Sequence, residues 1–201
     1  MPALETVQAF LKHNAMKPLL AGTLILCIMS LAAMTLAKCN KDSERPAKHD
    51  WPADTANHDE YVNLGLKSRT WWKSANEKNP ADPEYGFYTY DEAMAAFGDS
   101  LPTIQQFMEL RQSCEWVWVS VGFYIVIGPN NNHIILPAAG FRDCSGTLCY
   151  ERSYGFYWSS TPDGATRAWY MNFYSGDVYM YNYDRCYANS VRLVRNDQNI
   201  K

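Results

Sequence analysis

Residues 169–183 alternate apolar and polar side chains around one Ser-Gly pair, and this pattern restricts the segment to a β-hairpin. Successive side chains of a strand point to opposite faces, so every second residue shares a face. Ser175-Gly176 suits the two-residue turn that joins antiparallel strands. We expect the apolar face of this hairpin, together with Trp158, to lie in a hydrophobic core. The residues of that face are Trp169, Met171, Phe173, Val178 and Met180.

The opposite face of the hairpin carries tyrosines, of which the chain has an unusual number. It contains 14 Tyr and 7 Trp, and nine of the 14 Tyr fall between Tyr150 and Tyr187. Tyrosine favours strands, so an exposed tyrosine ladder could serve the hairpin alone. Tyrosine also provides a large rigid contact area and a hydroxyl, as recognition surfaces require. We predict a ligand-binding face made of Tyr170, Asn172, Tyr174, Asp177, Tyr179, Tyr181, Tyr183, Asp184, Arg185, Tyr187 and Asn189.

The N-terminal segment contains an uncharged run from Pro18 to Ala37, which is long enough to cross a bilayer as a helix. It is consistent with a cleaved signal peptide, a lipoprotein signal or an uncleaved anchor. The run ends in Leu36-Ala37-Lys38-Cys39, which resembles a lipobox, and the charged residues 40–44 resemble a surface-export tag. We favour a lipoprotein with a leader over residues 1–38 and lipidation at Cys39. This interpretation predicts an outer-membrane lipoprotein that is exposed at the cell surface and held to the membrane by its N-terminal lipid or anchor.

The cysteines that follow the leader predict a disulfide in an oxidising compartment. Residues 39–59 are polar and contain two prolines, so we interpret them as a tether, and residues 197–201 as a tail. Beyond Cys39 the chain contains Cys114, Cys144, Cys149 and Cys186, and four cysteines allow three pairings. Cys144 and Cys149 are close in sequence, and we favour a bond between them.

Several classes of function find no support in the sequence. The formal net charge of −3 argues against a nucleic-acid partner. No two of the four histidines, and no histidine and cysteine, have the sequence spacing of a metal site. The sequence contains no phosphate-binding loop, dinucleotide fingerprint or nucleophile elbow. We therefore predict a protein that is not an enzyme and binds no metal or cofactor.

Short helices and strands alternate along the folded part of the chain. Asp91 to Phe97 reads as a helix that ends at Gly98, and a second helix follows the N-cap candidate Thr103 and ends near Cys114. Residues 115–120, 122–127 and 133–136 read as strands, with a turn over residues 128–132. This order predicts an α+β fold with two short helices and short antiparallel strands.

A set of short motifs, in this order, resembles a known domain family. The motifs are Leu101-Pro102-Thr103, Trp116 with Trp118, Gly128-Pro129-Asn130, residues 136–142, Tyr157-Trp158-Ser159-Ser160-Thr161 and residues 190–194. Together they resemble the Fibrobacter succinogenes major paralogous (FISUMP) domain, over residues 60–196. The resemblance implies a C-type-lectin-like fold. The composition of the tyrosine face also resembles that of variable proteins diversified by retroelements.

Departures from related families narrow what the resemblance implies. Gly128-Pro129-Asn130 and Trp158-Ser159-Ser160 lack the carboxylates with which lectins of this fold hold calcium, so we expect calcium-independent binding. Residues 168–174 lack the cysteines of formylglycine-generating enzymes. We predict an adhesin-like surface lipoprotein that binds a protein or glycan. The alternatives are a structural subunit of an envelope or fimbrial assembly and, less favoured, an enzyme of the formylglycine-generating type.

Overall fold

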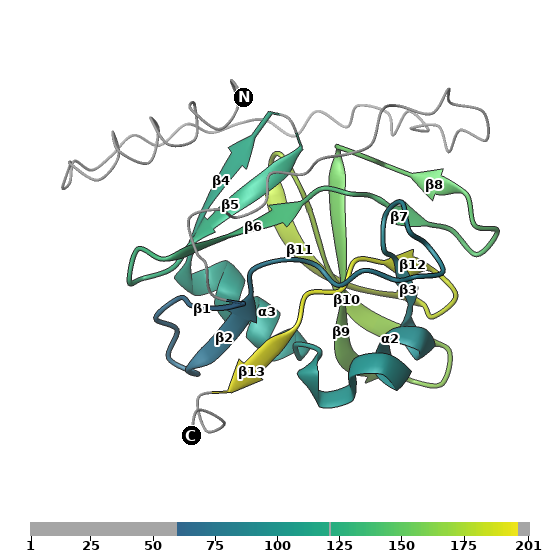
Figure 1. The fold of residues 1–201 in the computed structure, drawn as a ribbon, viewed down its shortest axis with the longest axis horizontal. Coiled ribbons are helices and arrows are strands. Elements are labelled where there is room, and N and C mark those ends of the chain that lie inside the picture. Colours follow the sequence, from purple (N-terminus) through teal and green to yellow (C-terminus); the bar gives the residue numbers. More distant parts are fainter. Residues whose placement is uncertain (1–59, 121, 197–201) are drawn as a thin grey trace, which may run out of the picture. The chain divides into compact units, whose positions relative to one another are not determined.

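Three long strands form the central sheet of the structure, a computed structural model that describes residues 60–120 and 122–196 (Figure 1). Strands β9 (Tyr154–Asp163), β10 (Arg167–Tyr174) and β11 (Asp177–Asp184) pair antiparallel, with β10 in the middle. Ser175 and Gly176 form the turn between β10 and β11, and Tyr174 pairs with Asp177 beside it. The hairpin predicted from the alternating side chains is therefore confirmed.

Three smaller sheets surround the central one, and the strands within each pair antiparallel. In the first, β5 (Phe123–Ile127) lies between β4 (Glu115–Val119) and β6 (His133–Pro137). The second has the order β1 (Tyr61–Asn63), β2 (Thr70–Lys73) and β13 (Val194–Asn196). The third has the order β3 (Tyr88–Thr89), β12 (Ala188–Asn189), β7 (Phe141–Arg142) and β8 (Leu148–Cys149).

Two short α-helices begin at capping boxes and match the predicted helices. In α2 (Tyr90–Phe97), Thr89 is the N-cap and exchanges hydrogen bonds with Glu92, and Gly98 is the C-cap. In α3 (Ile104–Ser113), Thr103 is the N-cap and exchanges hydrogen bonds with Gln106. The short 3₁₀ helix η1 (Gly98–Ser100) follows α2. Both predicted helices are confirmed, including Thr103 as an N-cap.

Hydrophobic clusters cover both faces of the central sheet. On one face, Phe107 of α3 and Trp72 of β2 pack in the same cluster as Met171 and Phe173. The ring of Phe173 lies so close to Gly155 of β9 that no Cβ would fit there. On the other face, the fully buried Trp158 packs with Tyr170, with Tyr90 of α2, and with Ala93 and Leu101. The sheet is therefore a central layer, which explains why its middle strand is buried on both faces.

The predicted α+β class is contradicted by this architecture, whereas the C-type-lectin-like fold stays a prediction. Strands make up 45% of the described residues and helices only 15%, in four small antiparallel sheets. The two helices are eight and ten residues long. They cover parts of the central sheet and form no layer of their own, so the class is mostly β.

A buried arginine connects separate parts of the domain. Arg192, between β12 and β13, is only 1% exposed. Its Nε donates to Asn76 Oδ1 (2.8 Å), and its terminal nitrogens donate to the carbonyls of Lys73 (2.8 Å) and Ile135 (2.7 Å). The planar guanidinium therefore bonds to the end of β2, to the loop after it and to β6 at once.

Replacing Arg192 with lysine tests this connection. An ammonium cannot reach all three acceptors in one plane, and a buried acceptor without a donor is costly. Arg192→Lys should lower the free energy of unfolding, measured with urea, by about 2–4 kcal/mol. The matched control is Arg69→Lys, since Arg69 is exposed and its replacement should change stability by about 0.5 kcal/mol at most. Equal stabilities for the two variants would contradict the role of Arg192.

Candidate functional site

The site is built on the face of the central sheet that α2 covers only in part. Paired residues of antiparallel strands have their side chains on the same face. Tyr154 pairs with Tyr174, and Tyr170 pairs with Tyr181 across the other side of β10. Asn172 lies between Phe156 and Tyr179 in the same way. Three strands thus place aromatic side chains in adjacent rows on one face.

The aromatic rings on this face contact one another in an almost closed circle. From Tyr181 the contacts run through Tyr179, Tyr174, Tyr154, Tyr150, Phe141 and Tyr187 to Tyr183, with ring centroids 4.4–6.2 Å apart. Phe156 lies inside the circle and contacts Phe141 at 4.7 Å and Tyr170 at 5.9 Å. We call these residues the tyrosine surface: Phe141, Tyr150, Tyr154, Phe156, Tyr170, Tyr174, Tyr179, Tyr181, Tyr183 and Tyr187.

Five of the eleven predicted ligand-binding residues are tyrosines of this surface that reach solvent. Tyr181 and Tyr183 are exposed, whereas Tyr174, Tyr179 and Tyr187 are half-buried. Asp177 and Asp184 lie at the two ends of β11 and Arg185 follows the strand, and each of the three is held in an ion pair.

Three of the predicted residues are buried, so the prediction that they are exposed is wrong. Tyr170 and Asn172 belong to the middle strand, and the Asn172 amide donates to the Gly155 carbonyl (3.1 Å). Asn189 is buried on β12 of the third small sheet, where it pairs with Tyr88 of β3. Of the two tryptophans predicted in the core, Trp158 is fully buried as predicted, whereas Trp169 is half-buried beside α3.

The sequence prediction missed four members of the tyrosine surface: Phe141, Tyr150, Tyr154 and Phe156. Tyr154 and Phe156 lie on β9, and their side chains point to the face opposite that of Tyr157. Their parity with Trp158, which was assigned to the core, could have placed them on the same face. Phe141 lies on β7, and Tyr150 directly follows β8. Each of these strands has only two residues, which is too short to show a period.

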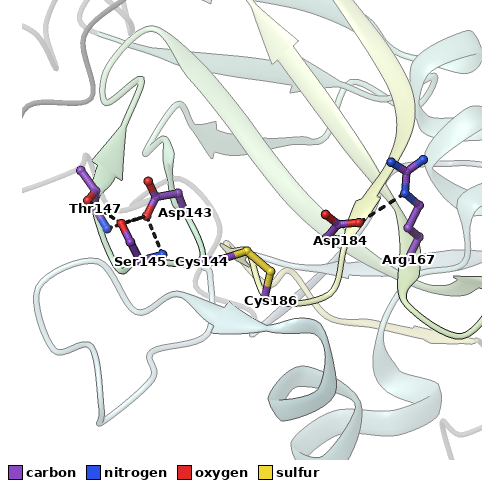
Figure 2. Close-up of a disulfide and its surroundings, with 7 residues drawn as sticks. All are labelled: Asp143, Cys144, Ser145, Thr147, Arg167, Asp184 and Cys186. Carbon is purple, nitrogen blue, oxygen red and sulfur yellow. Dashed lines mark hydrogen bonds and ion pairs between the residues drawn. A yellow bond between two sulfur atoms is a disulfide. The ribbon is translucent and has the colours of Figure 1, made fainter.

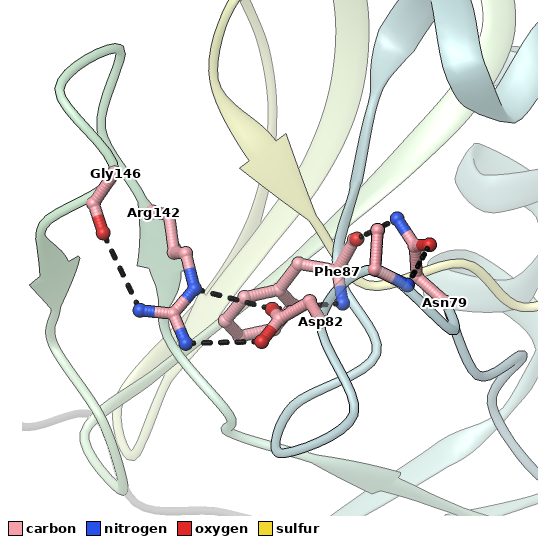
Figure 3. A network of polar contacts seen from close by, with 6 residues as sticks. Asn79, Asp82, Phe87, Arg142 and Gly146 are labelled. Carbon is pink, nitrogen blue, oxygen red and sulfur yellow. Dashed lines mark hydrogen bonds and ion pairs between the residues drawn. The ribbon is translucent and has the colours of Figure 1, made fainter.

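A polar network fixes the β7–β8 hairpin that carries Phe141 and Tyr150. Figure 3 shows Arg142 reaching Asp82 with two nitrogens, Nε (3.2 Å) and Nη2 (3.0 Å), and the Gly146 carbonyl with Nη1 (3.3 Å). Asp82 also accepts the backbone N–H of Phe87, whose carbonyl accepts the buried Asn79 amide. Because a two-pronged arginine–carboxylate contact defines orientation, the network orients β7 and with it Phe141.

A disulfide joins the same hairpin to the loop after β11. Cys144 in the turn after β7 bonds Cys186, which precedes Tyr187, with Cα atoms 5.1 Å apart (Figure 2). The predicted bond between Cys144 and Cys149 is therefore wrong. The hairpin register sets Cys149 opposite Phe141, whereas Cys144 lies beyond the last paired residues. The disulfide thus ties the segment of Phe141 to that of Tyr187.

The turn at Cys144 is held by the carboxylate of Asp143. Its Oδ1 accepts the backbone N–H of Ser145 and of Thr147, both at 2.9 Å, and the Ser145 hydroxyl at 2.6 Å (Figure 2). Asp143 therefore stabilises the turn from which Cys144 projects towards Cys186.

The charged residues at the two ends of β11 form ion pairs and leave the middle of the strand neutral. Arg111 contacts Asp177, and Arg167 contacts Asp184, each at 3.3 Å. Burial, with the nearby Tyr183 and Tyr181, raises the pKa of Tyr170 to about 12. A hydrogen bond with Tyr174, followed by burial, raises the pKa of Tyr179 to about 12, as a bond with Tyr183 does for the pKa of Tyr187. These phenols are therefore uncharged hydrogen-bonding groups at neutral pH.

The other reactive groups of the described domain lie outside this surface. Within residues 60–120 and 122–196, no three His, Cys, Asp or Glu side chains are grouped as a metal site. Burial raises the pKa of the Cys114 thiol to about 12, so it is protonated at neutral pH. The tyrosine surface offers aromatic rings for stacking and uncharged hydroxyls for hydrogen bonds.

Predicted segments at both ends of the chain lie outside the described residues. They are the leader over residues 1–38, the lipidation site Cys39, the tether up to residue 59 and the tail over residues 197–201. In the part of the chain that is described, no helix has the length and apolar character to span a membrane.

Comparison with known proteins gives one partial match. Residues 126–194 match the model of a family described as a domain of unknown function (DUF8237). No curated protein and no solved structure matches the chain. The matched segment contains every member of the tyrosine surface.

The disulfide makes a prediction about stability. Closing a loop of this length restricts the unfolded chain by about 4 kcal/mol, so Cys144→Ser with Cys186→Ser should lower the free energy of unfolding by about 2–4 kcal/mol. Cys114→Ser is the control, since Cys114 is a free thiol. Peptide mapping without reduction should recover Cys144 linked to Cys186, and a peptide with Cys144 linked to Cys149 would contradict the structure.

The raised tyrosine pKa values predict a loss of stability at alkaline pH. Between pH 10 and about 12 the folded state retains phenolic protons that the unfolded state releases. Their contribution is therefore complete below pH 10 and is lost as pH rises towards about 12. Ultraviolet titration should show a late-ionising group of tyrosines, and Tyr170→Phe should remove one member. Uniform ionisation near pH 10 would contradict this assignment.

Proposed function

We propose that this domain is a binding module that recognises its ligand through the tyrosine surface. The observation that carries the proposal is the concentration of exposed aromatic side chains there. Four large hydrophobic side chains of the described domain are exposed, and three belong to this surface: Tyr150 (36%), Tyr181 (57%) and Tyr183 (43%). Monomeric proteins seldom expose such a group together without a partner for it.

The physical properties of the surface suit recognition of an uncharged ligand face. Tyrosine rings lose little side-chain entropy on binding, and their hydroxyls donate or accept hydrogen bonds. The rings already contact one another, and the Cys144–Cys186 disulfide and the Arg142–Asp82 contact hold the segments that carry them. A surface that is already ordered before binding loses less conformational entropy when the ligand binds, and this raises the affinity.

The cellular setting of the proposal rests on the sequence. The lipobox-like Cys39 and the resemblance to FISUMP domains support a calcium-independent, adhesin-like lipoprotein at the cell surface. Its ligand is then a protein or a glycan, because both present faces that pack on aromatic rings and groups that bond hydroxyls.

Binding to arrays of glycans and of peptides tests the proposal. The full-length chain, purified in mild detergent, should bind members of one array, and a variant with Tyr150, Tyr181 and Tyr183 all changed to Ser should lose this binding at least about tenfold. All three residues are exposed, at 36–57%, and none belongs to the hydrophobic core clusters, so the melting temperature should change little.

Two controls separate recognition from folding. The triple Tyr→Phe variant retains the rings and isolates the contribution of the hydroxyls. Lys67→Ser changes an exposed residue between β1 and β2 and should leave binding intact. Unfolding of the triple Ser variant, or unchanged binding by it, would contradict the proposal.

A further inference from the structure

Strand β11 is the edge strand of the central sheet, and its outer edge has no partner strand among the described residues. Because a two-residue turn joins it to β10, Tyr174 and Asp177 form a hydrogen-bonded pair, and the odd-numbered residues of β11 bond to β10. The even-numbered residues therefore direct their backbone groups outward.

The hydrogen bonds at the ends of β11 agree with this parity. The outward N–H of Val178 is bound by the Asp177 carboxylate (2.7 Å), and the Asp184 carbonyl accepts from Tyr187 (3.3 Å). Between these ends, Met180 and Asn182 each present an N–H and a carbonyl at the open edge. These four groups have the spacing with which a further strand would pair.

A groove of about 580 Å³ runs between this edge and helix α3. The helix contributes Ile104, Met108, Arg111 and Gln112, which follow the spacing of one helix face. The sheet contributes Trp169 of β10 and Met180 of β11, with Tyr179 and Tyr181 at the border. Met108 is 43% exposed and, among residues 60–120 and 122–196, is the one exposed large hydrophobic side chain outside the tyrosine surface. The groove is therefore mostly apolar and lies beside unpaired backbone groups.

We propose that an extended segment of a partner protein adds to β11 as a further strand. Its backbone pairs with Met180 and Asn182, and alternate side chains enter the groove beside Met108 and Trp169. The remaining side chains point to the other face, against Tyr179, Tyr181 and Tyr183. This inference rests on the proposed function and names the class of its ligand as polypeptide.

The charges around the edge define the chemistry of that segment. The Arg111–Asp177 and Arg167–Asp184 pairs lie at opposite ends of β11, and the stretch between them carries no charged residue. In the middle of the groove, beside Met108, Trp169 and Met180, a charged side chain would lose water without gaining a charged partner. The segment should therefore be uncharged in its middle and apolar at every second position.

A second copy of this chain and a glycan are two other candidate occupants of the edge, and both fit it less well than a partner strand. In a second copy of this chain, Val178 is buried in that copy's own core cluster and the half-buried Met180 packs against that cluster, so neither is free to fill the groove. A glycan lacks the regular alternation of N–H and carbonyl groups that the open edge offers.

Selection from a displayed library of random nonapeptides on the full-length chain tests the inference. Enriched peptides should share apolar residues at alternate positions. Met108→Lys places a charge in the groove at an exposed position and should weaken the binding of a synthetic enriched peptide by about tenfold or more. Met108→Leu should retain this binding. The circular dichroism spectrum and melting temperature of both variants check that they fold.

Backbone methylation of the synthetic peptide gives a test that leaves the protein unchanged. In an added strand only every second residue donates to β11, so N-methylation at one set of alternate residues should abolish binding. Methylation at the other set should be tolerated and is the matched control.

Several results would overturn the inference. They are failure to enrich any peptide, equal effects of methylation at both sets, and unchanged binding by Met108→Lys. A dimer in sedimentation that Met108→Lys dissociates would assign the edge to a second copy instead. Binding to glycans alone, lost in the triple Tyr→Ser variant, would retain the proposed function and reject the added strand. Peptide binding that depends on Met108 but not on the tyrosines would retain the added strand and reject recognition through the tyrosine surface.

Discussion

The buried guanidinium of Arg192 is the interaction on which the arrangement of the sheets depends. An arginine cannot lose its proton in a protein, so its charge must be solvated by the chain itself. Asn76 and the carbonyls of Lys73 and Ile135 do this, and the Asn76 amide also donates to the hydroxyl of the buried Tyr157 (3.2 Å). That hydroxyl donates to the Pro137 carbonyl (2.8 Å). One polar network therefore connects β2, β6 and β9 inside the hydrophobic core.

The tyrosine surface is the part of the central sheet that this packing leaves uncovered. Both faces near Trp158 are enclosed, one by α3 with β2 and the other by α2. Beyond them the aromatic side chains pack on one another. Their outer segments are held by the Cys144–Cys186 disulfide and the partly buried Arg142–Asp82 contact, which restrain the surface more than isolated exposed ion pairs would.

Local patterns in the sequence predicted local structure well. Period-two alternation identified the β10–β11 hairpin, and capping residues identified α2 and α3. Alternation assigns side chains to two faces but does not say how each is covered, so the burial of Tyr170 and Asn172 escaped it. The α+β class was wrong because two short helices do not make a layer. The Cys144–Cys186 bond spans 42 residues and depends on how β7 and the loop after β11 meet, which no local pattern records.

The same strand that carries the tyrosines also leaves its edge open, and these two features are physically connected. Proteins commonly protect long edge strands with inward charges, prolines or bulges, because unpaired backbone groups invite another strand. Strand β11 has eight residues and contains no proline, and its two charged residues are at its ends. Its middle carries no charged residue, with tyrosine side chains on one face, among them Tyr179 with its raised pKa, and a mostly apolar groove on the other. An edge of this kind is a liability in a monomer unless it binds a partner, so its position beside the tyrosine surface agrees better with the proposed recognition function than with a purely structural ladder.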